Sequence, residues 1–265
     1  MENTEEASVA EDRVPAVESA VRILTFLKDR NHRPWGVSEL SRSLQLNKST
    51  CFNLLKALAR HALVAYDRGT KKYGLGSALI ELGGAASTAT SRATVAKPFL
   101  QDLFDELKLT CLLGQRFQDR VIIVDRVEAQ DAFRITIPVG QALPVGQGAL
   151  GRCFLAYFPE ADLDHFWSQG VLEQADPRRG QQIGQITKTL AKVRHQGFAE
   201  SFGEIAKGVN AVAAPIFDQR GHVILALGVI GFASLLPPRR LAHCGRKLRE
   251  VSGLISRIMG GQPRP

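Results

Sequence analysis

A short basic and polar segment carries the side chains best suited to contact DNA. Lys48, Ser49 and Thr50 supply an ammonium group and two hydroxyls at the start of a predicted helix, where free backbone N–H groups favour phosphate. Asn53 has an amide that can bind adenine through two hydrogen bonds, and Lys56 follows about one turn later. These donors point to a helix that enters a major groove, although the segment alone also fits an ordinary amphipathic surface helix.

An apolar stripe on the other side of this helix would hold it against a core. Asn47 precedes the stripe and is expected to cap the helix, because its side-chain oxygen can accept a backbone N–H of the first turn. The stripe recurs at steps of three and four residues and consists of Cys51, Leu54, Leu55, Leu58 and Ala62.

Two further helices are predicted before this one. Pro15 begins a helix that runs to about Arg30. Gly36 and Glu39 form a variant of the capping box that opens a short helix through Leu44. A turn at Gln45 and Leu46 then leads to the next helix, which is the spacing of a helix–turn–helix. The inward face of the first helix is predicted to be Val17, Ala20, Val21, Leu24 and Leu27.

A basic hairpin follows the third helix. Residues 63–66 and 72–75 are predicted to form two short strands, and Gly69 is expected to supply the positive φ of the turn. Arg68, Lys71 and Lys72 lie at or beside its tip, where they would contact phosphate or a minor groove. Three helices and a hairpin in this order predict a winged helix–turn–helix. Phe52 then has two alternative roles, packing against this wing or contacting a thymine methyl.

Charge and composition limit the class of protein. Residues 13–75 hold twelve Lys or Arg against four Asp or Glu in a chain of 265 residues with net charge +8, and this basic concentration is typical of nucleic-acid binding. Residues 1–12 are acidic and are predicted to be a disordered tail. No apolar run is long enough for a membrane span, and no signal peptide is recognised, so we expect a cytoplasmic protein. Four scattered cysteines indicate buried or free thiols rather than disulfides or zinc.

No pattern predicts an enzyme, a metal site or a cofactor. There is no GxSxG motif and no His/Cys set with metal-ligand spacing. Residues 146–151 match GxGxxG, but the polar segment after them does not resemble the second strand of a dinucleotide-binding unit. This loop is interpreted either as a tight structural turn or as a place where backbone N–H groups hold a carboxylate.

The ordered motifs resemble the IclR family of bacterial transcriptional regulators. The motifs are VPAVESA at 14–20, LNKST at 46–50, KYGLG at 72–76, the run 121–128, the loop 140–151, QGFA at 196–199, GV at 208–209, VAAPIFD at 212–218 and Gly231. They cover about 14–260. One departure from the family is Gln45, where relatives usually have glycine. Gln45 must therefore adopt an unusual backbone angle or reshape the turn.

This resemblance implies an α+β protein with two functional domains. The expected boundaries are a winged helix–turn–helix at 13–76, a linker helix at 77–96 interrupted at Gly83 and Gly84, and a GAF-like effector-binding and oligomerisation domain at 97–261, in which Pro98 restarts a helix. The implied partners are double-stranded operator DNA, a small organic effector and further copies of the chain in a homodimer or a dimer of dimers. We expect a repressor. The alternative is a small-molecule binding module with little DNA affinity.

The resemblance also suggests an effector pocket whose polarity is low. Ser201, Ala211, Gly228 and Ile230 stand where some relatives carry an acid, a cysteine and two serines. Because these changes remove hydrogen-bond partners, we expect an aromatic acid or aromatic carbonyl compound, with Glu204 or the 148–151 loop holding its polar end. The alternative is that the positions are simply core. The predicted pocket residues are Cys111, Leu113, Gly148, Ala149, Leu150, Gly151, Ser201, Phe202, Glu204, Ala211, Gly228 and Ile230.

Overall fold

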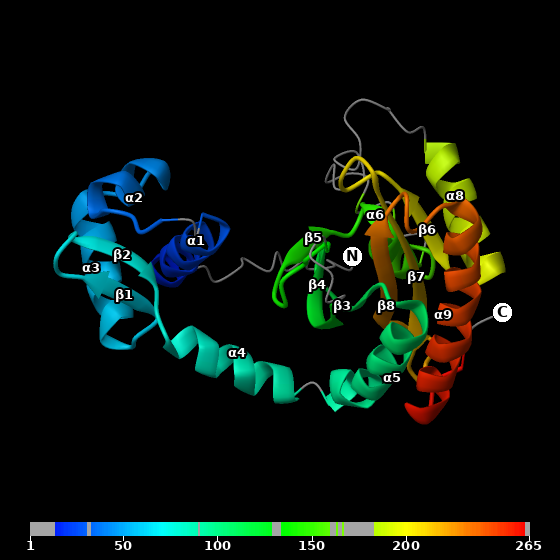
Figure 1. Cartoon of the computed structure of the whole chain (residues 1–265). Coiled ribbons are helices and arrows are strands. Elements are labelled where there is room, and N and C mark those ends of the chain that lie inside the picture. The colour runs from blue at the N-terminus through cyan, green and yellow to red at the C-terminus, as the bar shows by residue number, and fades with distance from the viewer. Residues whose placement is uncertain are drawn as a thin grey trace, which may run out of the picture. The chain divides into compact units, whose positions relative to one another are not determined.

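The computed structural model describes residues 14–30, 33–89, 91–128, 134–159, 163, 166 and 183–262. Contacts divide the chain into two compact units, Met1–Ala89 and Thr90–Pro265. Each unit has its own hydrophobic core and its own sheet, labelled in Figure 1. The predicted acidic tail at 1–12 lies outside the described residues.

The first unit is a three-helix bundle with a hairpin and a further helix. Its core joins the three helices to the hairpin through Ile23, Leu27, Leu40, Leu55 and Tyr73, all buried. The elements are α1 (Pro15–Asp29), α2 (Val37–Ser43), α3 (Lys48–Arg60), β1 (Val64–Asp67), β2 (Lys72–Leu75) and α4 (Ala78–Ala89). The predicted winged helix–turn–helix is confirmed.

Two local predictions in this unit were wrong. The buried face of α1 centres on Ile23 and Leu27, whereas Val17 and Val21 are more than half exposed. The reason is that α1 meets α3 and β2 along a narrower face than its apolar residues cover. Helix α3 ends at Arg60, so Ala62 lies in the following turn rather than on the helical stripe.

Two backbone details also differ from expectation. Asn47 occupies the N-cap position of α3, but its side chain makes no capping hydrogen bond to the described first turn. In the hairpin, the left-handed residue is Lys71 at φ 55°, not Gly69. Asp67 explains the second difference, because its carboxylate accepts hydrogen bonds from the backbone N–H groups of Gly69 and Thr70 and holds the turn in another form.

The turn between α2 and α3 contains the strain predicted for Gln45, whose φ is 54°. A left-handed conformation costs a residue with a Cβ about 1–2 kcal/mol. We expect Gln45→Gly to stabilise the first unit by about 0.5–1 kcal/mol, because relief of this strain outweighs the greater freedom of glycine in the unfolded chain. Thermal denaturation measures the change, and an unchanged or lower midpoint would contradict it. Gln45 is exposed, so the substitution removes no core contact.

The segment after the hairpin does not follow the predicted pattern of breaks. Helix α4 runs through Gly83 and Gly84, and α5 (Ser91–Leu107) begins well before Pro98, which lies inside it. Helix α5 tolerates the proline because Pro98 is exposed, while Ala96 and Leu100 on the other side of the helix are buried in the core of the second unit. Burial of this face therefore outweighs the missing hydrogen bond of the proline.

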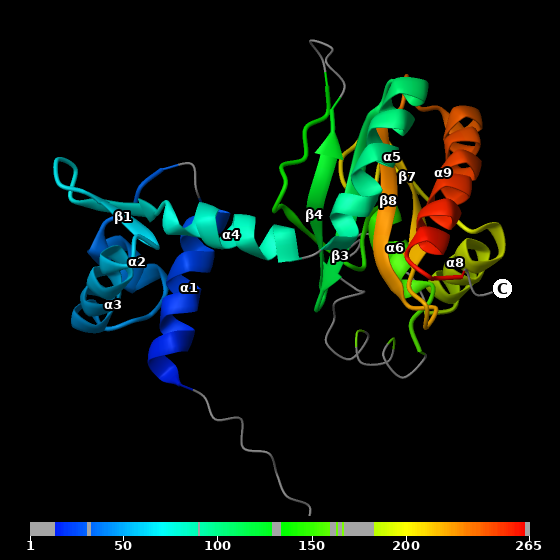
Figure 2. The ribbon, with the colours of Figure 1, turned by 90° about the horizontal axis from the view of Figure 1, so that it is seen from below.

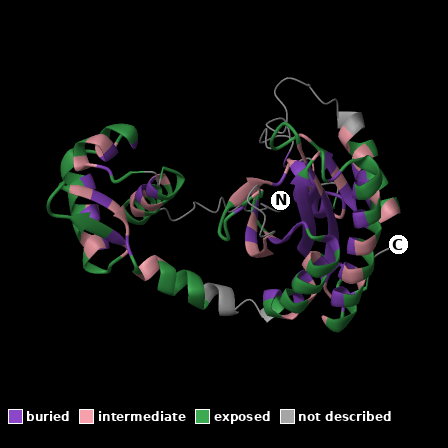
Figure 3. Cartoon of the chain, viewed as in Figure 1, coloured by how far each residue is buried: buried purple, intermediate pink, exposed green. Residues whose placement is uncertain are grey.

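The second unit is built on a six-stranded antiparallel sheet of order β5-β4-β3-β8-β7-β6. Its central strands are almost entirely buried and appear purple in Figure 3. The strands are β3 (Thr110–Phe117), β4 (Arg120–Val127), β5 (Ala142–Pro144), β6 (Ala199–Phe202), β7 (Val209–Phe217) and β8 (Val223–Phe232).

Helices cover both faces of this sheet. Helix α5 and the final helix α9 (Pro238–Ile258) share one core with strands β3, β7 and β8, and Figures 1 and 2 show the two helices on the same side of the sheet. Helices α6 (Gly148–Leu155) and α8 (Ile183–Gln196) form a second core on the other face. This arrangement is the predicted α+β domain with a GAF-like sheet.

The cysteines are free thiols, and all four are buried. Burial raises the pKa of the Cys111 thiol to about 12, which makes it unreactive near neutral pH. Within the described residues there is no group of three side chains suited to hold a metal ion. None of the described helices is long and apolar enough to cross a membrane.

Candidate nucleic-acid interface and ligand pocket

The outer face of α3 presents the predicted DNA-contacting residues to solvent. Ser49, Asn53 and Lys56 follow one another at steps of four and three, so they lie on one side of the helix. The opposite side is anchored by Cys51 and Leu55, both fully buried. The exposed residues of α3 are Lys48, Ser49, Thr50, Phe52, Asn53, Lys56 and, at its last position, Arg60.

Phe52 is 47 % exposed, so about half of its surface can contact another molecule. Such an exposed ring favours the second of its two predicted roles, contact with a thymine methyl in a groove.

An arginine that the sequence did not single out holds the turn before α3. Arg22 of α1 donates from Nη2 to the backbone oxygen of Leu44 over 2.6 Å. The start of α2 is held similarly, because the Glu39 carboxylate accepts the Gly36 N–H over 2.8 Å and pairs with Arg33. The Gly36 hydrogen bond, followed by Arg33, lowers the pKa of Glu39. These contacts hold the turn that precedes α3 and the start of α2.

The tip of the wing is ordered by Asp67. Its carboxylate accepts hydrogen bonds from the Thr70 hydroxyl and from the N–H groups of Gly69 and Thr70, and these bonds lower its pKa. Arg68 and Lys71 are exposed, whereas Lys72 is half-buried opposite Asp67 in the hairpin register. The ordered turn therefore displays two exposed cations, Arg68 and Lys71.

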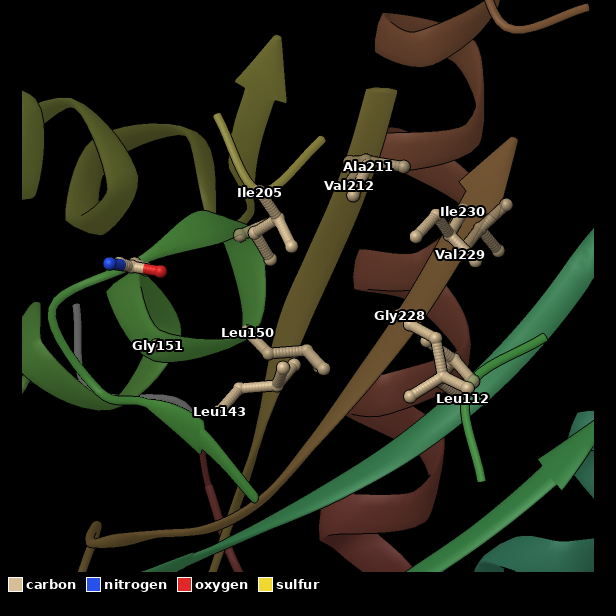
Figure 4. Close-up of a pocket in the computed structure, with 13 residues that line it drawn as sticks. Leu112, Leu143, Leu150, Gly151, Ile205, Ala211, Val212, Gly228, Val229 and Ile230 are labelled. Atoms are coloured by element: carbon tan, nitrogen blue, oxygen red, sulfur yellow. The ribbon is translucent and has the colours of Figure 1, made fainter. Parts of the chain in front are cut away.

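The second unit contains a small apolar pocket between the sheet and α6, on the face away from α9. Figure 4 shows Leu112 and Ile230 on the strands, with Leu150 and Ile205 on the opposite side. The cavity volume is about 20 Å³, room for little more than one water molecule. The lining residues are Leu112, Ile137, Leu143, Gln147, Ala149, Leu150, Gly151, Ile205, Ala211, Val212, Gly228, Val229 and Ile230.

Half of the predicted pocket residues line this cavity. They are Ala149, Leu150, Gly151, Ala211, Gly228 and Ile230. The space that Gly228 leaves is used by Leu150, whose Cδ2 lies 3.0 Å from the position that a Cβ would take at residue 228. Gly151 is required for a different reason, because the backbone of Val145 occupies the place of its missing side chain. The glycines therefore allow close packing, as expected for a structural turn.

The other six predicted residues do not line it. Cys111 and Leu113 belong to the core with α5 and α9, so our placement of them in the pocket wall was wrong and Leu112 takes their place. Strand β3 is apolar on both faces, and its sequence therefore does not reveal which residues face which side. Ser201 is buried and pairs in register with Ala211, while Phe202 is about half exposed.

The last two predicted residues, Gly148 and Glu204, each contact another side chain of the protein. Gly148 has a φ of 68°, and Ile205 fills the space beside it, with Cδ1 2.7 Å from the position of a Cβ. Glu204 forms an ion pair with Arg152 rather than presenting a free carboxylate. Neither Arg152 nor Ile205 was predicted. A lone isoleucine in a loop bounded by glycines was the sequence signal that could have identified Ile205.

Comparison with known proteins gives two matches to family models and several full-length relatives. Residues 16–68 match the IclR helix-turn-helix domain, and residues 86–257 match the bacterial transcriptional regulator IclR C-terminal domain. The crystal structure of an IclR transcriptional regulator from Alicyclobacillus acidocaldarius is 32% identical, with a TM-score of 0.82 over 94% of this chain and 100% of that one.

Curated sequences of Escherichia coli agree with these matches. The repressor AllR is 26% identical over 97% of this chain and 94% of its own length. The uncharacterized regulator RhmR is 27% identical, covering 94% of each chain.

Proposed function

The chain belongs to the IclR family of bacterial transcriptional regulators, and from this premise we propose that it is a repressor that binds a near-palindromic operator as a homodimer or a pair of dimers. The observation that carries the proposal is the exposed set of donors on α3 beside the two cations of the wing. Residues 13–76 would form the DNA-binding domain, 77–96 the linker and 97–261 the effector domain. The similarity to AllR, which is a repressor, supports repression rather than activation.

Exposed apolar residues in the first unit support dimerisation. Val17 and Val21 of α1 are 59 % and 54 % exposed, and Ile80 and Leu82 of α4 are 79 % and 58 % exposed. Val17 and Val21 are four residues apart and lie on one side of α1, and exposed apolar surface of this kind is what another protein covers in many complexes. A second copy of the chain would cover them and set the distance between two α3 helices.

The effector is proposed to be an aromatic acid or an aromatic carbonyl compound. The pocket offers leucine, isoleucine and valine side chains together with the amide of Gln147. A small, strongly hydrated acid has little apolar surface to bury against this lining, so it would gain little free energy there in exchange for its water. An aromatic body gains free energy from the same surface, at roughly 25 cal/mol for each Å² removed from water.

Selection of random DNA duplexes on the full-length protein tests this function. We expect enriched sequences with two inverted half-sites about one or two helical turns apart, and retention that falls steeply with salt. Phenylacetate is then expected to change the retention of the selected duplex, whereas pyruvate at the same concentration should leave it unchanged. Failure to enrich any sequence, with no salt-dependent retention, would instead favour a ligand-binding module that does not bind DNA.

A further inference from the structure

The effector pocket is closed as it stands. Its volume of about 20 Å³ admits roughly one water molecule, far less than an aromatic ring needs. Strands β3, β7 and β8 form its floor and cannot separate without loss of the sheet hydrogen bonds. Any effector of the proposed size therefore requires movement of the opposite wall.

The residues 203–208 form the part of that wall best able to move. Gly203 and Gly208 begin and end this loop, and both have positive φ, 66° and 82°. Between them, Ile205 lines the pocket and fills the space beside Gly148, although 43 % of it is exposed. Figure 4 shows its side chain projecting from the loop toward α6 and Leu150. Ile205 thus closes the pocket from a loop with a glycine at each end.

One ion pair ties this loop to α6. Nη1 of Arg152 donates to Oε1 of Glu204 over 2.8 Å, and Nη2 donates to Oε2 over 2.6 Å. The same guanidinium donates to the backbone oxygen of Glu200 on β6 over 2.6 Å. The two side chains are 15 % and 31 % exposed, so solvent screens this pair less than a fully exposed one. The arginine is held by α6 and β6, while Glu204 belongs to the loop.

We propose that the loop 203–208 is the gate of the effector pocket and that the Arg152–Glu204 pair is its latch, which the carboxylate of an aromatic effector replaces. The inference rests on the proposed function. Two parallel hydrogen bonds from a guanidinium suit any carboxylate, so an effector can exchange with Glu204 without leaving Arg152 unpaired. Arg152 and Glu204 do not line the cavity themselves, but each is next in the chain to a lining residue, Gly151 and Ile205, so the exchange would take place beside the pocket.

Hydrogen exchange of the full-length protein without ligand tests the latch. Glu204→Gln keeps the shape of the side chain but removes its charge, and we expect the peptide that spans 203–209 to exchange about tenfold faster, the change produced by losing ~1.4 kcal/mol. Lys192→Gln is the matched control. It removes a 2.8 Å ion pair to Glu200 on the same edge strand and does not touch the loop, so it should leave that peptide unchanged.

Phenylacetate and its neutral analogue phenylacetamide test the exchange of carboxylates. Glu204→Gln should bind phenylacetate about tenfold more tightly than the unmodified protein, because Arg152 no longer has a competing partner. Arg152→Gln should lose the preference for phenylacetate over phenylacetamide.

The outcomes separate this inference from the proposed function. Unchanged exchange at 203–209 in Glu204→Gln overturns the latch, whatever the ligands do. Faster exchange while neither probe shifts the thermal midpoint of any variant supports the gate and counts against an aromatic effector. A preference for phenylacetate that survives Arg152→Gln overturns the role of Arg152 in binding the carboxylate.

Discussion

Replacing Asn53 with alanine is expected to remove most of the preference for the operator and to leave binding to unrelated DNA nearly unchanged. Asn53 lies on the exposed face of α3, in line with Ser49 and Lys56. A bidentate amide–adenine contact contributes about 1–3 kcal/mol of discrimination, and the proposed dimer carries two copies, so the specific loss should reach about 2–6 kcal/mol. Fluorescence anisotropy with the selected operator and a scrambled duplex measures both affinities.

Lys56→Ala provides the control for this substitution. Lys56 is exposed one turn further along α3, and its ammonium group is expected to contact phosphate. Its removal should weaken binding to both duplexes alike and reduce the salt slope by about one for each subunit. An equal loss of affinity for both duplexes in Asn53→Ala would show that Asn53 reads no base.

Replacing Leu112 with tryptophan should remove the ligand response, whereas replacing Leu113 with tryptophan should lower stability, although the two leucines are neighbours on β3. Leu112 lines the pocket, so the larger side chain should occupy the effector's place and abolish the thermal shift by phenylacetate. Leu113 is fully buried against α5 and α9, where overpacking should lower stability by about 3 kcal/mol and the midpoint by roughly 6–12 °C.

This pair of variants tests the register of β3 directly. Leu112→Trp should stay folded, because the extra volume can displace Ile205, whose loop is bounded by glycines. Circular dichroism and thermal denaturation follow the fold, and the ligand-induced shift follows the pocket. A folded Leu113→Trp without ligand response, beside a responsive Leu112→Trp, would reverse our assignment of the two faces.

Local features of the sequence were enough to predict the first unit. The spacing of apolar residues in α3, the capping box at Gly36 and Glu39, and the basic hairpin are short-range patterns. Each depends on contacts within a few residues, so periodicity and turn chemistry identify it. The unusual angle at Gln45 was predicted from the resemblance, because relatives usually have glycine at this position.

The chain's own sequence therefore determined the winged helix–turn–helix, the donors of α3 and the α+β class of the second unit. The apolar character of the pocket was inferred from the resemblance, by comparison with the polar residues of relatives. Only the tertiary structure decided which face of β3 meets the pocket, because a strand that is apolar on both sides has no alternation to read. It also brought Arg152 to Glu204, 52 positions apart in the chain. Such pairs form through packing between distant segments of the chain, so no local sequence pattern predicts them.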